Sequence, residues 1–281
     1  PLAVAVREGV FTVASSDGTV AAFQADTGRE VWRTSVDGRI VAGVGSDGRF
    51  AAVVTREGEL VVLDGGKLLW RKPVGTKVVT APLVAGERIF VLGVDRRVIA
   101  WDALDGRKLW QQQRPGEPLT LAQGGVLAAF KNTLLVGQGP RLAGLDPLNG
   151  SVRWEVPVAS PRGTNEVERL ADLVAPLLRQ GDSVCVRAFQ SAVGCVNAER
   201  GNLQWSKNVG GTEGIAGLGA LMREAQHRAD QQHEQRHQRH HADQAEFLRG
   251  DGEHEIGVCF RQVEQLLHAV AETDAGHLAA T

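Results

Sequence analysis

The sequence predicts an all-β fold, a β-propeller of four-stranded antiparallel blades. Three observations support this prediction. A turn motif that ends in tryptophan recurs five times, two short apolar segments precede each copy, and helical periodicity is absent up to residue 215. Four strands in roughly 40 to 45 residues is the repeat of a propeller blade. In every copy a glycine lies four residues before the tryptophan, giving the pairs Gly28 and Trp32, Gly66 and Trp70, Gly106 and Trp110, Gly150 and Trp154, and Gly201 and Trp205.

Two expected strands precede each copy of the motif and form a hairpin. They are rich in β-branched and apolar residues and are bounded by turn residues, which is the pattern of strands. In the first repeat the turn is Ser16, Asp17 and Gly18. The five expected pairs are 10–13 with 19–23, 50–54 with 59–63, 89–92 with 98–101, 134–136 with 141–145, and 184–186 with 192–196.

The motif itself supplies the next turn and the third strand. Its glycine reaches positive φ without a Cβ penalty, and the tryptophan then opens a strand. We expect a fourth strand to follow, at 78–83 in the second repeat. Packing between blades requires a large side chain at the same position of every repeat. We therefore expect these tryptophan rings to fill blade interfaces rather than to stack on a ligand.

Charge and hydropathy exclude two classes of partner. The net charge is −2 without a clustered basic face, which speaks against nucleic acid. No run of eighteen apolar residues predicts a membrane span. The segment from Pro1 resembles the one from Pro82, so we expect the sequence to begin inside a blade, with any targeting segment upstream.

Cys185 and Cys195 fall on the two arms of a predicted hairpin centred near Gln190. A cross-strand pair has about the Cα separation that a disulfide tolerates. Two small buried hydrophobic residues are the alternative, since that is the common fate of a free cysteine. An oxidising compartment would favour the disulfide.

The composition changes near Ala216. All eight histidines lie beyond this residue and all six tryptophans lie before it. We therefore expect a partial propeller over 1–215 and a His/Gln/Arg-rich tail over 216–281, either helical or disordered. A metal site at His233, His237 and His241 is a weaker hypothesis, based on their helical spacing. The favoured hypothesis for the tail is a frame-shifted or chimeric segment.

The Asp-x-x-x-Gly-x-x-x-Trp repeat is similar to those of pyrroloquinoline-quinone-type propellers, a superfamily that includes quinoprotein dehydrogenases. Those enzymes need calcium ligands, a catalytic aspartate and often a vicinal cysteine pair. Residues 1–215 contain no adjacent cysteines, no histidine and no acidic or amide cluster beyond the turn positions. We therefore expect no enzymatic activity and no cofactor, and keep a quinoprotein dehydrogenase-like propeller as the alternative.

One insertion interrupts the regular spacing of the repeat. The interval between successive tryptophans grows from 44 residues, Trp110 to Trp154, to 51 residues, Trp154 to Trp205. Charged insertions on one face of a propeller are common binding sites. Through the five repeats, the segment 118–121 with its Leu-x-Leu pattern, and the insertion 163–172, the sequence resembles the BamB family. These are propeller lipoproteins of the outer-membrane β-barrel assembly machinery of Gram-negative bacteria.

The resemblance implies an eight-bladed ring, of which about five repeats are present. It also implies a periplasmic, non-catalytic scaffold at the outer membrane, held by a lipid anchor that this sequence lacks. The implied partners are the periplasmic POTRA domains of BamA and nascent outer-membrane proteins. Carried over by position, the binding residues are Leu119, Leu121 and Asp172, with Glu166 and Arg169 as weaker candidates.

The sequence departs from the family pattern at two positions of this implied site. Ala122 stands where an arginine is frequent, and Val174 stands where a second acidic residue is frequent. Loss of both removes charges that would fix the register of a partner. From spacing alone, Leu119 and Leu121 are equally well explained as ordinary strand residues that point to one face of a blade.

Overall fold

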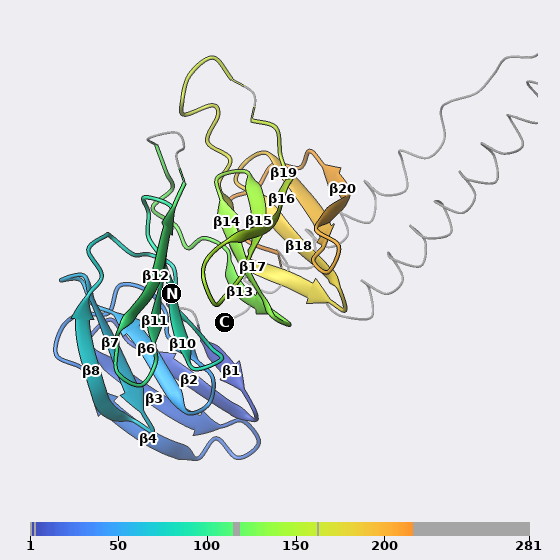
Figure 1. Cartoon of the computed structure of the whole chain (residues 1–281). Coiled ribbons are helices and arrows are strands. Elements are labelled where there is room, and N and C mark those ends of the chain that lie inside the picture. Colours follow the sequence, from blue (N-terminus) through green and yellow to red (C-terminus); the bar gives the residue numbers. More distant parts are fainter. Residues whose placement is uncertain (1, 3, 115–118, 162, 216–281) are drawn as a thin grey trace, which may run out of the picture. The chain divides into compact units, whose positions relative to one another are not determined.

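The computed structural model describes residues 2, 4–114, 119–161 and 163–215. This described part consists of twenty strands in five four-stranded antiparallel sheets (Figure 1), and it contains no helix. The predicted blade architecture is therefore confirmed for this region. The predictions made for residues 216–281, including the histidine site at 233, 237 and 241, lie outside the described residues.

Each sheet is one blade, and its four strands follow one another in chain order. Blade 1 contains β1 (Ala5–Arg7), β2 (Val10–Ala14), β3 (Thr19–Gln24) and β4 (Glu30–Ser35). Blade 2 contains β5 (Gly45–Ser46), β6 (Phe50–Val54), β7 (Glu59–Asp64) and β8 (Lys67–Pro73). Blade 3 contains β9 (Leu83–Ala85), β10 (Arg88–Leu92), β11 (Arg97–Asp102) and β12 (Lys108–Gln113).

The remaining two blades follow the same plan. Blade 4 contains β13 (Leu127–Phe130), β14 (Thr133–Gln138), β15 (Arg141–Leu145) and β16 (Val152–Pro157). Blade 5 contains β17 (Leu173–Gln180), β18 (Ser183–Ala188), β19 (Ala192–Asn197) and β20 (Asn202–Lys207). All ten predicted hairpin strands lie within these elements, because sequential antiparallel strands need only short turns.

The fourth strand differs from the prediction. It was expected at 78–83, after the tryptophan strand and in the same blade, but β9 covers Leu83–Ala85 and pairs with β10, so it opens the next blade. Val78 makes only an isolated bridge to Gly93. Pro82 has no N–H to donate to a ladder, which explains why the strand begins only after it.

In blades 2 to 4, the central strands are buried on both faces. In β6, Phe50 and Val54 belong to a core shared with blade 3, whereas Ala51 and Val53 belong to a core shared with blade 1. Two further cores lie between blades 3 and 4 and between blades 4 and 5. Strands that are buried on both faces have continuous apolar runs rather than alternating ones, which is how these segments appear in the sequence.

Four of the motif tryptophans pack against the next blade, as predicted. Each ring lies over the motif glycine of the following blade, at such close range that a Cβ on that glycine would lie within 3 Å of ring atoms. The indole N–H of Trp70 also donates to the carbonyl of Ala103, at 2.8 Å. The fifth ring, Trp205, is 41% exposed, and the residues that follow Ile215 are not described. The four packed pairs are Trp32 with Gly66, Trp70 with Gly106, Trp110 with Gly150, and Trp154 with Gly201.

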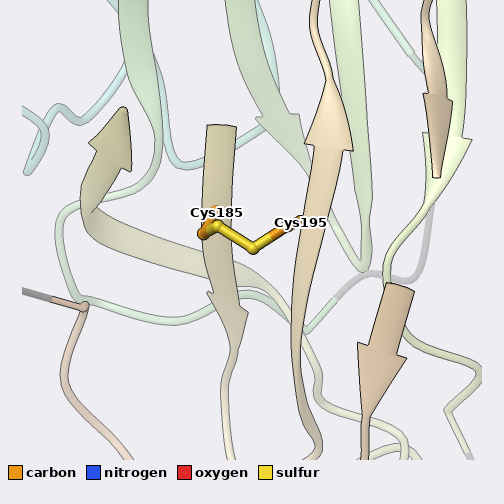
Figure 2. The surroundings of a disulfide bond; sticks show 2 residues. All are labelled: Cys185 and Cys195. Carbon is orange, nitrogen blue, oxygen red and sulfur yellow. A yellow bond between two sulfur atoms is a disulfide. The ribbon is translucent and has the colours of Figure 1, made fainter. Parts of the chain in front are cut away.

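A disulfide joins Cys185 of β18 to Cys195 of β19 across one hairpin (Figure 2). The two residues face each other in register, with their Cα atoms 4.0 Å apart. Both are almost fully buried. The bond therefore links the two central strands of blade 5 inside the core.

Candidate protein-binding site

The Leu-x-Leu segment lies in the connection between blades 3 and 4. Leu119 and Leu121 are half-buried and belong to no strand, since β12 ends at Gln113 and β13 begins at Leu127. Their interpretation as ordinary strand residues is therefore wrong, and the two-residue spacing does not place them on one face of a sheet. We refer to residues 119–125 as the 119–125 loop.

Asp172 lies at the end of the insertion, directly before β17. Its Oδ2 atom accepts a hydrogen bond from the backbone N–H of Leu121, at 3.0 Å. Its Oδ1 atom forms an ion pair with Arg96, at 3.3 Å. The structure thus places Asp172 in contact with Leu121, two residues that are far apart in the sequence.

Backbone hydrogen bonds fix Asp172 and the residue after it. The carbonyl of Asp172 accepts from the N–H of Phe189, at 3.0 Å, and the N–H of Leu173 donates to the carbonyl of Gly139, at 2.9 Å. Gly139 is in the β14–β15 hairpin and has a φ of +62°, a conformation that favours glycine. The position of the Asp172 carboxylate is therefore set by blades 4 and 5.

The C-terminal half of the 119–125 loop is tied to three neighbouring segments, one of them through the side-chain amide of Gln123, which donates to the carbonyl of Thr212, at 3.0 Å. The N–H of Ala175 donates to the carbonyl of Gly124, and the N–H of Gly125 donates to the hydroxyl of Thr80, both at 2.9 Å. Gly125 also forms an isolated antiparallel bridge with Val174. These contacts anchor the loop between the segment that precedes β9 and the start of β17.

A small, shallow hollow, partly open to solvent, lies where these segments meet. Its wall combines apolar side chains, such as Leu92, Leu121 and Leu173, with the Arg96–Asp172 pair. Leu119, Glu166 and Arg169 do not line it.

The tip of the insertion forms a turn of its own at 165–170. The carboxylate of Glu168 accepts hydrogen bonds from the N–H of Thr164, at 2.7 Å, and from its hydroxyl, at 3.1 Å. The first of these bonds is the main reason why the pKa of Glu168 lies below its ordinary value. Glu166 is exposed in this turn, and Arg169 is half-buried. The turn is therefore organised by local contacts.

The two departures from the family pattern occupy different environments. Ala122 is exposed beside Leu121, so a larger or charged residue there would reach solvent. Val174 is buried, with 1% of its surface exposed, in the paired part of β17. In this protein, the side chain at position 174 is packed in the interior, where it also lines the hollow.

Arg96 is the residue that sequence reasoning missed. It lies in the β10–β11 turn and is 76 residues from Asp172 along the chain. The turn pattern predicts a hairpin there but carries no signal for a long-range partner. Only the packing of blades 3 to 5 brings the two side chains together.

Residues 2, 4–114, 119–161 and 163–215 offer neither a metal site nor a membrane-spanning helix. These residues contain no group of three histidine, cysteine, aspartate or glutamate side chains that could hold a metal ion. Within the same ranges, no helix has the length and apolar character needed to cross a bilayer.

Five blades linked by tryptophan–glycine contacts define a β-propeller protein built from repeats of the pyrroloquinoline-quinone type. A sequence model of the family described as "Outer membrane protein assembly factor BamB" matches residues 16–235, well over half of the chain. The chain therefore belongs to the BamB family.

Individual comparisons agree with this assignment. The BamB assembly factor of Bordetella pertussis is 33% identical over 205 residues, covering 72% of this chain and 53% of the relative. The chain spans about half the length of the curated relatives it matches. The crystal structure of BamB from Moraxella catarrhalis superposes with a TM-score of 0.68 at 20% identity, over 75% of this chain and 65% of that one.

A quinohemoprotein alcohol dehydrogenase from Comamonas testosteroni is similar in fold. Its TM-score is 0.54 at 17% identity, over 78% of this chain and 46% of the enzyme. At that identity the likeness extends to the fold alone, since one fold hosts many functions.

Proposed function

We propose that this protein is a non-catalytic scaffold that binds the periplasmic POTRA region of BamA and supports the assembly and insertion of β-barrel proteins at the periplasmic face of the outer membrane. The observation that carries the proposal is the hydrogen bond between Leu121 and Asp172. It joins at one place the two segments that the family resemblance marks as the binding site. Membership of an assembly-factor family supports the same function.

Binding would rely on apolar anchors. Leu119 and Leu121 are each only partly buried and so have some surface left to bury against a partner. Full burial of a leucine side chain contributes about 1.5–3 kcal/mol, and binding would add only the share of this burial that the free protein still lacks. Asp172 lies beside them, and Glu166 and Arg169, on the separate turn of the insertion, would act at the edge of a larger contact.

The exposed Ala122 affects how the affinity for a partner should depend on charge and salt. Without an arginine at this position, less positive charge is available to steer the partner or fix its register. We therefore expect an affinity that changes little with ionic strength, because buried apolar surface is not screened by salt.

Binding of the full chain to the purified periplasmic region of BamA, measured by calorimetry, tests the proposal. The double variant Leu119→Glu with Leu121→Glu should lose binding. The matched control is Leu104→Glu with Leu148→Glu, which changes two exposed leucines in the motif turns of blades 3 and 4. Unchanged affinity of the first variant would overturn the proposal.

The non-catalytic part of the proposal has its own test. The curated relatives are named as assembly factors, which supports it. Purified protein mixed with pyrroloquinoline quinone, calcium and a primary alcohol should reduce an electron-accepting dye no faster than the mixture without protein. Turnover in this assay would favour a dehydrogenase instead.

A further inference from the structure

We infer that Asp172 is a positioning residue and that Arg96 acts with it. Together they form a clamp, defined here as the Arg96–Asp172 ion pair and the hydrogen bond from Leu121 to Asp172. The clamp holds the 119–125 loop in the shape that presents its leucines. This inference deepens the proposed function and rests on it.

The contacts of Asp172 argue for positioning rather than direct contact with a partner. Both carboxylate oxygens already have partners inside the protein, the N–H of Leu121 and the guanidinium of Arg96. Only 17% of the Asp172 side chain is exposed. Hydrogen bonds to an ionised carboxylate are about twice as strong as neutral ones, so a partner would gain little by replacing them.

Arg96 is itself held in place. Arg96 lies in the tight β10–β11 turn with a φ of +62°. Its backbone N–H donates a hydrogen bond to the carbonyl of Gly93, at 3.1 Å. Its side chain is 13% exposed. The guanidinium therefore projects from a fixed hairpin of blade 3 to the carboxylate that precedes blade 5.

The leucine segment needs such support because its own backbone forms no regular structure. Residues 119–124 lie outside every strand, and the tethers at Gln123, Gly124 and Gly125 act only on the far end of the loop. The Leu121 N–H is the point where the clamp reaches the leucines themselves. A loop ordered in advance loses less conformational freedom on binding, which raises affinity.

Amide hydrogen exchange of the full chain tests the clamp without any partner. Asp172→Ala should accelerate exchange at Leu121 roughly tenfold, the effect of losing about one charge-assisted hydrogen bond. Asp172→Asn keeps an acceptor oxygen and should have a smaller effect, whereas Arg96→Met should approach that of Asp172→Ala. The control is Arg97→Met, the neighbouring arginine that pairs with Asp95. Unchanged exchange at Leu121 in Asp172→Ala would overturn the inference.

Binding to the periplasmic region of BamA then tests what the clamp is for. The variants should lose affinity in the same order in which they accelerate amide exchange at Leu121, and Arg97→Met should bind as tightly as the unaltered protein. If Asp172→Ala weakens binding while Leu121 exchange stays slow, Asp172 is a contact residue, and the inference fails while the proposed function survives. If exchange rises but affinity does not fall, the clamp plays no part in binding. Absence of binding by the unaltered protein removes the proposed function itself, before any variant is made.

Discussion

The indole ring of Trp70 lies directly over the α-carbon of Gly106, the motif glycine of the following blade. A Cβ built on Gly106 would come within 2.7 Å of the ring. The motif glycine is thus required for two separate reasons. The glycine is needed by its own turn, and its missing side chain also makes room for the tryptophan of the blade before it.

This contact predicts that Gly106→Ala is more harmful than the same change at Gly28. Both glycines have a φ of +66°, so both variants lose about 1 kcal/mol to backbone strain. Nothing lies within 4 Å of a Cβ at Gly28, whereas at Gly106 the Trp70 ring must move, at an additional cost of about 1–3 kcal/mol. Free energies of unfolding from urea titrations measure the difference, and equal losses would show that the ring contact does not contribute.

The indole N–H of Trp70 supports a second prediction. Trp70→Phe removes the donor to the buried carbonyl of Ala103, so we expect a loss of about 1–2 kcal/mol in the free energy of unfolding. Trp205→Phe is the control, because that residue is 41% exposed and its indole N–H makes no hydrogen bond within the described residues. Its effect should stay within about 0.5 kcal/mol. A loss as large as that of Trp70→Phe would mean that Trp205 is buried in solution.

Local features of the chain were predictable, and long-range pairings were not. The hairpins around Gly18 and Gly58 follow from turn chemistry and apolar runs, which act over a few residues. The opening strands of the blades gave weak signals, since β5 has only two residues and Pro82 shifts β9. The sequence also indicated that tryptophans pack between blades, but it did not identify the glycine that each ring meets.

The same distinction applies to the candidate site. The proximity of Leu121 and Asp172 was implied by the family resemblance, not by any local pattern. Arg96 carries no signal in the sequence, because its partner lies 76 residues away along the chain and only tertiary packing brings them together. Val174 is the opposite case. The family pattern places this position in the binding site, but the pairing of β17 with β18 buries it.

The disulfide in blade 5 gives a prediction about redox conditions. Cys185 and Cys195 are separated by 10 residues, and closing a loop of this size stabilises a fold by about 2–3 kcal/mol in the chain-entropy account. A reductant should therefore lower the free energy of unfolding of the unaltered protein by about this amount. The double variant Cys185→Ala with Cys195→Ala should be insensitive to reductant. Equal stability of the unaltered protein with and without reductant would contradict the expectation.

Acid should weaken blade 4 through Asp146. Its carboxylate accepts a 2.8 Å bond from Arg153 and another from the N–H of Leu148, and the Arg153 bond is the main cause of its lowered pKa. A carboxyl whose pKa is lower in the folded than in the unfolded protein stabilises the fold. This contribution is complete at a pH above the unfolded-state pKa, which is near 3.9, and is lost as the pH falls through the folded-state pKa. The stability difference between the unaltered protein and Asp146→Asn should therefore be constant near neutral pH and shrink below about pH 4. Urea titrations across this range measure it. A difference that persists at the lowest pH would assign the effect to the hydrogen bonds of the uncharged side chain rather than to its charge.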